Sequence, residues 1–416
     1  MSRVMLVVAV LLCAGVAACG GEDECSPGAI CTIAGNGQAG YAGDGGDARN
    51  AALYLPIDQA VSPDGELWII DFNNFRVRAV DDGGAIRTVL GSGELGDSPA
   101  QDGEASVPAL EAALSHMTDL LFRGRSLYVA AWHNSRVKRL DLDTMLLEDH
   151  AGRGVRTYYD GDGGPALDAA FDLPVALASD PDGDLLIMDQ ANQVIRAVDG
   201  EGVIRRVAGQ CVVEPEADGS EGGCGDDAPP LACPGSDKLI CGLADQCASP
   251  CTPSFAGDGG DALEMRMGQP FGQEVGPSGH MALDADGGLL FADTNNHRIR
   301  RIAADGIVST VAGTGERGFA GDGGDARQAQ LDAPTDLEIA EDGSIYIADT
   351  YNHCVRAIDP AGIITTVAGR CGEPGFSGDG GPAADATMKL PSGLELAGDR
   401  LYIADTGNHR VRAVVR

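Results

Sequence analysis

Short segments that alternate apolar and polar residues run along most of the chain. Within residues 336–369, DLEIAE leads through an Asp-Gly pair to SIYIAD, and CVRAID turns through Pro-Ala-Gly into IITTVAG. This alternation is typical of strands, and Asp-Gly, Pro and Gly are typical of the tight turns between them. The stretch therefore predicts four short antiparallel strands in a row.

One motif repeats six times along the chain and sets its period. The copies are DFNNFRVRAV at 71, AWHNSRVKRL at 131, DQANQVIRAV at 189, DTNNHRIRRI at 293, DTYNHCVRAI at 349 and DTGNHRVRAV at 405. Neighbouring copies start 56 to 60 residues apart, except for one interval of 104 that holds a Cys-rich insertion at 210–254. Six four-stranded units at this period predict an all-β, six-bladed β-propeller.

The fourth-strand motif also occurs six times, but it is shifted by one unit. It first occurs as CTIAG at 31–35, ahead of the other strands, and the last unit ends at Arg416 after its third strand. We expect the N-terminal strand to complete the last blade and so close the ring. The predicted domains are a signal peptide at 1–18, a tether at 19–30 and the propeller at 31–416.

Five glycine-rich loops share the core GDGG, as in GFAGDGGDA at 318–326. Either Asp or Pro follows, then Ala, which predicts a short helical turn because Asp suits an N-cap and Pro the first turn. A calcium ligand would not interchange with proline. We interpret the loops as repeat architecture whose aspartates make one face acidic. These aspartates are Asp44, Asp162, Asp258, Asp322 and Asp379.

Over residues 32–416 the units resemble NHL repeats, most clearly in IYIADTYNHCVRAI and LYIADTGNHRVRAV. The glycine loops followed by TVAG resemble the NHL propellers of teneurins and many bacterial surface proteins. Blade 2 departs most, with Ala131 in place of the aspartate and Lys138 in place of the arginine. The resemblance implies a propeller, but propellers host both enzymes and binding modules, so it does not imply an activity.

The D-x-x-N motif is predicted to be structural, because it recurs around the whole ring. Its arginines are expected to pair between blades. His297, His353 and His409 occupy one repeat position on separate blades, too far apart for a shared metal ion. The recurring arginines are Arg78, Arg196, Arg300, Arg356 and Arg412.

The N-terminus predicts export. Arg3 precedes an apolar run from Val4 to Val16, which is typical of a secretory signal, and VAAC at 16–19 resembles the lipobox of bacterial lipoproteins. That resemblance implies lipidation of Cys19 and, with Gly20, an outer-membrane or cell-surface lipoprotein of the envelope. The alternative is an ordinary signal peptide cut near Ala18. We expect membrane contact only through the lipid.

Ten further cysteines are expected to form disulfides in an exported protein, within each of three groups. The groups are Cys25 and Cys31; Cys211, Cys224, Cys233, Cys241, Cys247 and Cys251; and Cys354 and Cys371. The formal net charge of −34 excludes nucleic acid and anionic lipid as partners.

Four ionisable residues fall at one position of the predicted inner strands: Asp58, Asp119, His280 and Asp336. Blade 3 has Ala176 there. We expect the four to converge at the channel mouth, on the face that carries the loops. Such a set suits Ca²⁺ or another divalent ion, as in propeller lactonases and lyases, where the metal polarises the substrate. The alternative is a row of hydrated acids lining a wet channel.

Two functions are compatible with these features. The first is a lipid-anchored binding scaffold that meets a protein or glycan on its acidic loop face, with the insertion between Cys211 and Cys251 as the preferred recognition element. The second is a metal-dependent lyase or lactonase-like enzyme acting in the channel. No Ser-His-Asp, Cys-His or phosphate-loop pattern stands out, so we favour the scaffold. The binding scaffold requires no cofactor. Ca²⁺ is expected only if the alternative, the channel enzyme, is correct.

Overall fold

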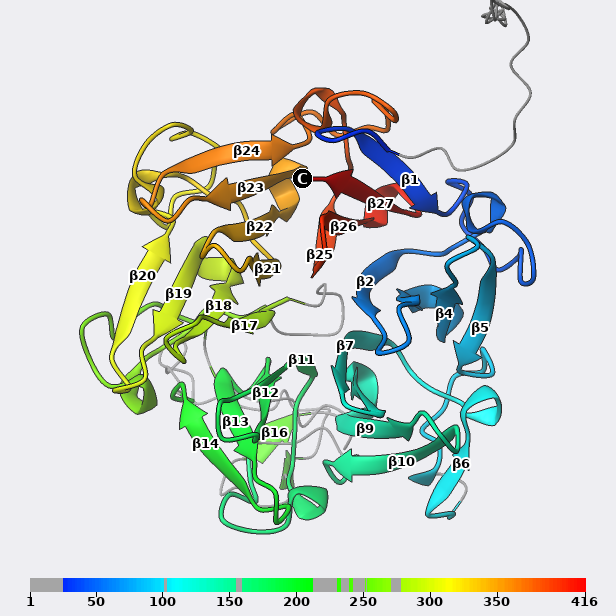
Figure 1. Cartoon of the computed structure of the whole chain (residues 1–416). Coiled ribbons are helices and arrows are strands. Elements are labelled where there is room, and N and C mark those ends of the chain that lie inside the picture. Colours follow the sequence, from blue (N-terminus) through cyan, green and yellow to red (C-terminus); the bar gives the residue numbers. More distant parts are fainter. Residues whose placement is uncertain are drawn as a thin grey trace, which may run out of the picture.

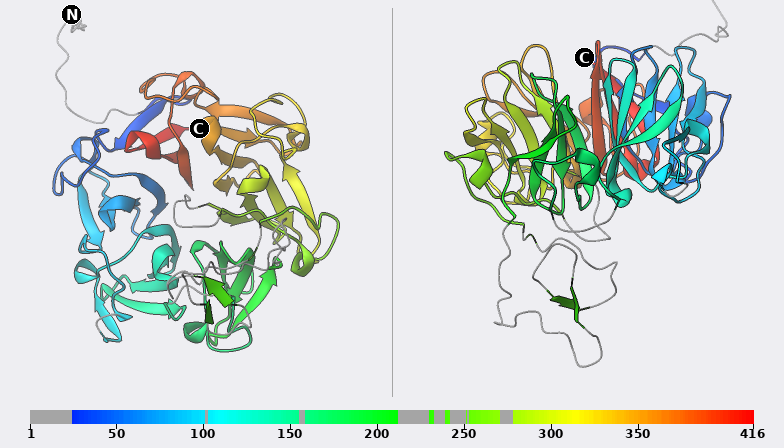
Figure 2. Two further views of the ribbon diagram at one scale, coloured as in Figure 1. Left: turned by 180° about the vertical axis from the view of Figure 1, so that it is seen from behind. Right: turned by 90° about the horizontal axis from the view of Figure 1, so that it is seen from below.

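Six antiparallel sheets stand in a ring in the computed structural model (Figure 1). The structure describes residues 25–100, 103–154, 159–211, 230–232, 239–241, 251, 253–270 and 278–416. Figure 2 shows the ring from behind and edge-on. The prediction of a six-bladed, all-β propeller is confirmed.

Each blade runs from an inner strand at the channel to an outer strand at the rim. Blade 1 contains β2 (Pro56–Val61), β3 (Leu67–Asp71), β4 (Arg76–Val80) and β5 (Ile86–Leu90). Blade 2 contains β7 (Met117–Arg123), β8 (Ser126–Ala131), β9 (Arg136–Asp141) and β10 (Leu146–Ala151), with β6 (Ser106–Pro108) added at its outer edge. Blade 3 contains β11 (Pro174–Ser179), β12 (Leu185–Asp189), β13 (Val194–Val198) and β14 (Ile204–Ala208).

The second half of the ring repeats this order. Blade 4 contains β17 (Met281–Leu283), β18 (Leu289–Asp293), β19 (Arg298–Ile302) and β20 (Val308–Ala312). Blade 5 contains β21 (Asp336–Ile339), β22 (Ile345–Asp349), β23 (Cys354–Ile358) and β24 (Ile364–Ala368). Blade 6 contains β25 (Pro391–Ala397), β26 (Arg400–Asp405), β27 (Arg410–Val415) and the N-terminal β1 (Ile30–Ala34).

The N-terminal strand closes the ring, as predicted. β1 pairs antiparallel with β27, with Ile30 opposite Val414 and Thr32 opposite Arg412. Figure 1 shows β1 beside β27 at this seam. A disulfide between Cys25 and Cys31 lies beside the junction. The first and last segments of the propeller thus share one sheet, and the ring has no unpaired end at this seam.

The Cys-rich insertion is closed at its base by a disulfide between Cys211 and Cys251. Inside it, β15 (Pro230–Ala232) pairs with β16 (Leu239–Cys241). The predicted disulfide partners Cys224, Cys233 and Cys247 lie outside the described residues. A third disulfide joins Cys354 to Cys371 in blade 5.

Blades pack face to face, so most strands are buried on both sides. β12, with the sequence LLIMD, is buried at all five positions. Between blades 3 and 4, Val175 and Ile195 pack in one apolar cluster with Phe291 and Met265. Burial on both faces explains why second strands such as β12 are nearly continuous apolar runs.

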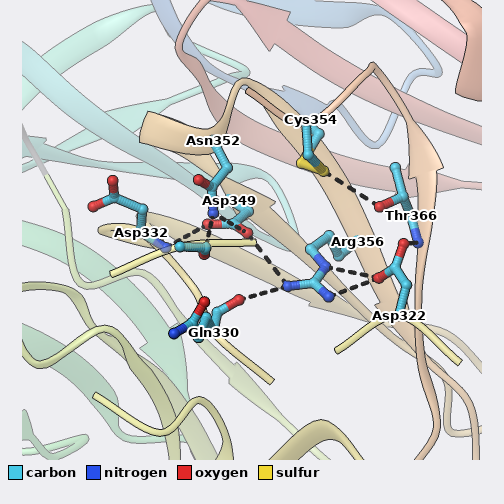
Figure 3. The surroundings of a disulfide bond; sticks show 10 residues. Asp322, Gln330, Asp332, Asp349, Asn352, Cys354, Arg356 and Thr366 are labelled. Atoms are coloured by element: carbon cyan, nitrogen blue, oxygen red, sulfur yellow. Dashed lines mark hydrogen bonds and ion pairs between the residues drawn. A yellow bond between two sulfur atoms is a disulfide. The ribbon is translucent and has the colours of Figure 1, made fainter. Parts of the chain in front are cut away.

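A buried arginine in the third strand organises each blade except blade 2. In blade 5, Arg356 donates to the Asp322 carboxylate at 2.6 Å and to the Gln330 carbonyl at 2.7 Å, and it lies 3.7 Å from Asp349 (Figure 3). Asn352 donates to Asp349 at 2.8 Å. We call this group the arginine clamp. Equivalent clamps contain Arg78, Arg196, Arg300 and Arg412.

The clamps correct one prediction. The arginines do not pair between blades; each ties the GDGG loop to the blade that follows the loop in sequence. The loop first crosses to the outer strand of that blade, where Gly323 donates to Ile364 and Ile364 donates back to Gly324. Only then does it return to the centre through a 3-10 turn. The carboxylate of Asp322 is therefore held by Arg356 and by the Thr366 amide rather than left free to bind an ion.

The predicted helical turns are present after the GDGG loops. Asp325 caps the 3-10 turn at Ala326–Gln328 by accepting from the Arg327 amide. Where proline replaces the aspartate, as at Pro382, it takes the N-cap position itself and not the first turn. Aspartate and proline are interchangeable here because both hold the extended backbone that precedes the turn.

The repeated histidines bridge blades through hydrogen bonds. The Nδ1 atoms of His297, His353 and His409 accept the backbone N–H of Ala333, Leu390 and Leu55, each at the start of the next blade.

Blade 2 differs at the clamp, because Lys138 binds Asp97 and Asp149, each at 2.7 Å. An acid from the outer strand thus replaces the aspartate that Ala131 lacks.

Candidate channel site

The inner strands build two rings of side chains around the channel. The first ring lies near the start of each inner strand, and the second lies two residues further along, on the same side of the strand. The first ring is Asp58, Asp119, Ala176, His280, Asp336 and Gly393; the second is Ala60, Leu121, Ala178, Ala282, Glu338 and Glu395. Blades 5 and 6 alone contribute acids to the second ring.

Most of these side chains surround one cavity of about 270 Å³. Its lining includes all four predicted residues, Asp58, Asp119, His280 and Asp336, together with Glu338, Glu395 and Gln59. Among the residues that the structure describes, the lining contains five carboxyl groups and an imidazole but no lysine or arginine. The structure therefore brings the four predicted residues together and adds two acids to them.

Sequence reasoning missed Glu338 and Glu395, although a signal was present. Inner strands five and six read DLEI and GLEL, and period two in a strand places the glutamate on the same side as the residue two before it. In blade 6 the first-ring position is Gly393, where a Cβ would come within 2.5 Å of the Ile57 carbonyl and 2.9 Å of Asp58 Oδ1. Glycine is required there because the strands approach so closely.

The first-ring aspartates are buried, whereas Glu338 and Glu395 of the second ring are half-buried. Asp58 and Asp336 are each 3% exposed. The reason is a set of bonds between blades, in which a carboxylate accepts an amide N–H from the next inner strand. Asp58 accepts from Leu120, Asp119 from Leu177 and Asp336 from Leu394. Glu395 accepts from Val61 in the same way and so links blade 6 to blade 1.

Burial raises the pKa of all five acids, and neighbouring carboxylates add to the effect in four of them. Burial, followed by the Asp119 and Asp336 carboxylates, raises the pKa of Asp58 well above its usual range. Burial raises the pKa of Asp119, and it raises that of Asp336 to about 6. The pKa of Glu395 rises to about 7 and that of Glu338 rises further above normal, again mainly through burial. A raised pKa means that an ionised carboxylate in this cavity costs free energy unless a cation balances its charge.

Three donors in this cavity lie close enough to share one ion. Atoms of Asp58, His280 and Asp336 all fall within 4.8 Å of one another, and His280 Nδ1 lies 3.4 Å from Asp336 Oδ1. The Asp119 carboxylate lies close enough to raise the pKa of Asp58. The arrangement offers two carboxylates and an imidazole from three different blades.

Comparisons with known proteins agree with this architecture. The sequence pattern of the teneurin NHL domain matches residues 16–131 and 314–374. Teneurin-1 of Homo sapiens is 28% identical over 411 residues, covering 94% of this chain. The chain is an NHL-repeat β-propeller. It spans only 13% of the length of that teneurin, so the activities of whole teneurins are not carried over.

Solved structures share the fold of this NHL propeller at low identity. A protein of unknown function from Bacteroides thetaiotaomicron VPI-5482 is 15% identical with a TM-score of 0.59, and the match covers 92% of this chain and 74% of that one. An auxiliary nutrient binding protein from the same organism has a TM-score of 0.57 at 15% identity, with 92% and 75% covered. At this identity the similarity concerns the fold alone.

The covalent features of the NHL propeller are typical of exported proteins. Three disulfides join described cysteines, and such bonds persist in oxidising compartments. Among the described residues, none of the helices has the length and apolar character needed to cross a membrane.

Proposed function

We propose that this NHL propeller is an exported binding module, anchored through a lipid on Cys19, that recognises a protein or glycan with its loop face. The loop face is the side that carries the GDGG loops and the D-x-x-N turns. One observation supports the proposal above the others: a belt of half-exposed aromatic side chains, one before each GDGG loop. They are Tyr41, Tyr159, Phe255, Phe319 and Phe376.

The rings of this aromatic belt keep a large part of their surface exposed to solvent. Tyr41, Phe255, Phe319 and Phe376 are 44%, 40%, 51% and 42% exposed. Several stack on arginines at the start of the third strand, as Phe376 does on Arg410 with 3.8 Å from the guanidinium carbon to the ring centroid. Stacking fixes each ring in one orientation without covering its outer surface.

Carboxylates lie beside these rings. The side chains of Asp44 and Asp322 are 36% and 44% exposed. Rigid aromatic rings bordered by hydrogen-bond acceptors suit sugar rings and peptides, because each ring offers a large contact area at little conformational cost. An auxiliary nutrient binding protein with the same fold shows that such a ring can serve as a binding module.

A belt variant tests the loop face. Tyr41→Ser, Phe255→Ser, Phe319→Ser and Phe376→Ser together remove the exposed rings. The matched control is Leu146→Ser with Ile307→Ser, which removes two aliphatic side chains that are 39% and 42% exposed at or just before the beginning of outer strands and leaves every belt ring in place. We expect the belt variant, but not the control, to lose binding on a glycan array or to surface proteins of the producing organism. Equal binding by both variants would refute the loop face as the recognition surface.

Anchoring is tested separately. Cys19→Ser should release the protein from the membrane fraction and abolish incorporation of labelled palmitate, without changing the fold. Palmitate incorporation that persists in this variant would contradict a lipid on Cys19 and leave the binding proposal standing.

A further inference from the structure

The channel cavity gathers acids that no lysine or arginine balances among the described residues. In that part of the chain, five carboxyl groups and one imidazole surround about 270 Å³. Elsewhere in the blades, buried acids such as Asp349 lie beside a buried arginine. The channel acids lack such a partner, so the cavity is suited to a cation.

A second observation points to a ligand in the same cavity. Gln59 lines it and is 2% exposed, yet neither its Oε1 nor its Nε2 has a hydrogen-bond partner among the described residues. The hydroxyl of Ser179, also in the lining, is buried and unpartnered as well. Leaving a buried amide unsatisfied costs about 1–3 kcal/mol, so such groups are expected to have a partner. A bound ion with its water ligands would supply one.

We propose that Asp58, His280 and Asp336 bind one divalent transition-metal ion at the centre of the propeller. The carbonyl oxygen of Gln59 is then placed to serve as a further ligand or to accept from a metal-bound water. Asp119 lines the same cavity and adds a further acid beside the ion. The site takes its ligands from blades 1, 4 and 5, so the ion joins non-adjacent parts of the ring.

The donor set selects the class of ion. Ca²⁺ and Mg²⁺ prefer sets made only of oxygen, whereas imidazole suits Zn²⁺, Fe²⁺ and Ni²⁺. Two ligands bound at about 2.0–2.2 Å lie at most about 4.4 Å apart, and the three donors lie within 4.8 Å of one another. A small side-chain movement therefore completes the site. The sequence alone suggested Ca²⁺, and the position of His280 favours a transition metal instead.

Calorimetric titration of the chelator-treated mature protein with Zn²⁺, Mn²⁺, Ca²⁺ and Mg²⁺ tests this assignment. We expect Zn²⁺ to bind more tightly than Ca²⁺ and Mg²⁺. In the double variant Asp58→Asn, Asp336→Asn, the Kd for Zn²⁺ should rise about 100-fold or more. The matched control Glu395→Gln removes an acid from the same cavity but leaves the three ligands in place, and its Kd should change less than about threefold.

Several results would overturn the proposal. One is no Zn²⁺ binding by the wild type; another is a Kd that is the same in the wild type and the double variant. Tighter binding of Ca²⁺ than of Zn²⁺ would refute the assignment to a transition metal. His116 and His133 place their Nδ1 atoms 2.9 Å apart and offer Zn²⁺ another location. The change of Kd in the variants therefore tests the channel site, whereas the number of bound Zn²⁺ ions does not. If circular dichroism shows that the double variant is unfolded, His280→Ala decides instead, with the same expected loss of Zn²⁺ affinity.

Discussion

Buried aspartates lie beside a buried arginine in the outer part of five blades, whereas those at the centre of the ring do not. In the clamps, Asp349 and its equivalents lie beside a buried arginine and accept from an asparagine and a backbone amide. In the channel, Asp58, Asp119 and Asp336 accept backbone amides, and His280 is their one basic neighbour among the described residues that line the cavity. The clamp recurs in five blades, whereas no two blades contribute the same pair of residues with an ionisable group to the channel rings.

This difference separates structural from functional chemistry. A group that recurs in nearly every blade serves what all blades need, namely a fixed connection between loop and sheet. The channel acids differ between blades, so the repeat itself does not require them. Burying them nevertheless costs free energy. Buried acids without a counter-charge are typical of binding and catalytic sites.

Removing a clamp arginine should have the largest effect. Arg356→Ala leaves Asp349 buried without its counter-charge, so we expect the free energy of unfolding to fall by about 4 kcal/mol, as measured by urea denaturation. Arg125→Ala is the control, because Arg125 forms only exposed ion pairs with Asp64 and Asp143 and should hardly change stability. Similar losses in the two variants would remove the distinction between clamp and surface arginines.

The GDGG loop should respond unequally at its first and second glycines. Both have positive φ, but a Cβ at Gly321 would lie 2.7 Å from the Ala329 Cα, whereas nothing lies within 4 Å at Gly323. We expect Gly321→Ala to destabilise by about 3 kcal/mol and Gly323→Ala by about 1 kcal/mol, because only the first adds a steric clash to the backbone strain. Thermal unfolding of both variants tests this. Equal shifts would mean that the loop moves away from the blade to accommodate the methyl group.

Neutralising a channel acid should stabilise the metal-free protein, which is the opposite of the clamp. Burial raises the pKa of Glu395 to about 7 from its usual 4.5. The folded state therefore holds a proton that the unfolded state has released, and this stabilisation is full below about pH 4.5 and lost as the pH rises through 7. Between pH 5 and 8 the wild type should lose about 2 kcal/mol more than Glu395→Gln.

Urea unfolding at both pH values, with chelator present, measures this difference. Asp64→Asn serves as the control, since its side chain is 63% exposed and the pH dependence should match that of the wild type. Parallel pH profiles for the wild type and Glu395→Gln would show that Glu395 is ionised throughout and that burial does not govern its proton.

Prediction from the sequence succeeded where one period repeats and failed where a side chain meets another blade. Asp58, Asp119, His280 and Asp336 were found by counting along the repeat, and the structure places them in one cavity. Glu338 and Glu395 were missed because the other four blades have no acid at the second-ring position, so the repeat does not mark that position. The arginines were assigned to the wrong partners, because the path of the GDGG loop over the outer strand is not visible in the repeat.

The sequence by itself determined the number of blades, the order of strands and the closure of the ring. These follow from local alternation, turn residues and a fixed period, and all three act within one unit or between neighbouring units. The tertiary structure alone decided that the first-ring aspartates are buried and that no arginine lines their cavity in the described part of the chain. Burial and charge balance at the axis depend on six strands that are distant in sequence, so only the closed ring brings their side chains within a few ångströms of one another.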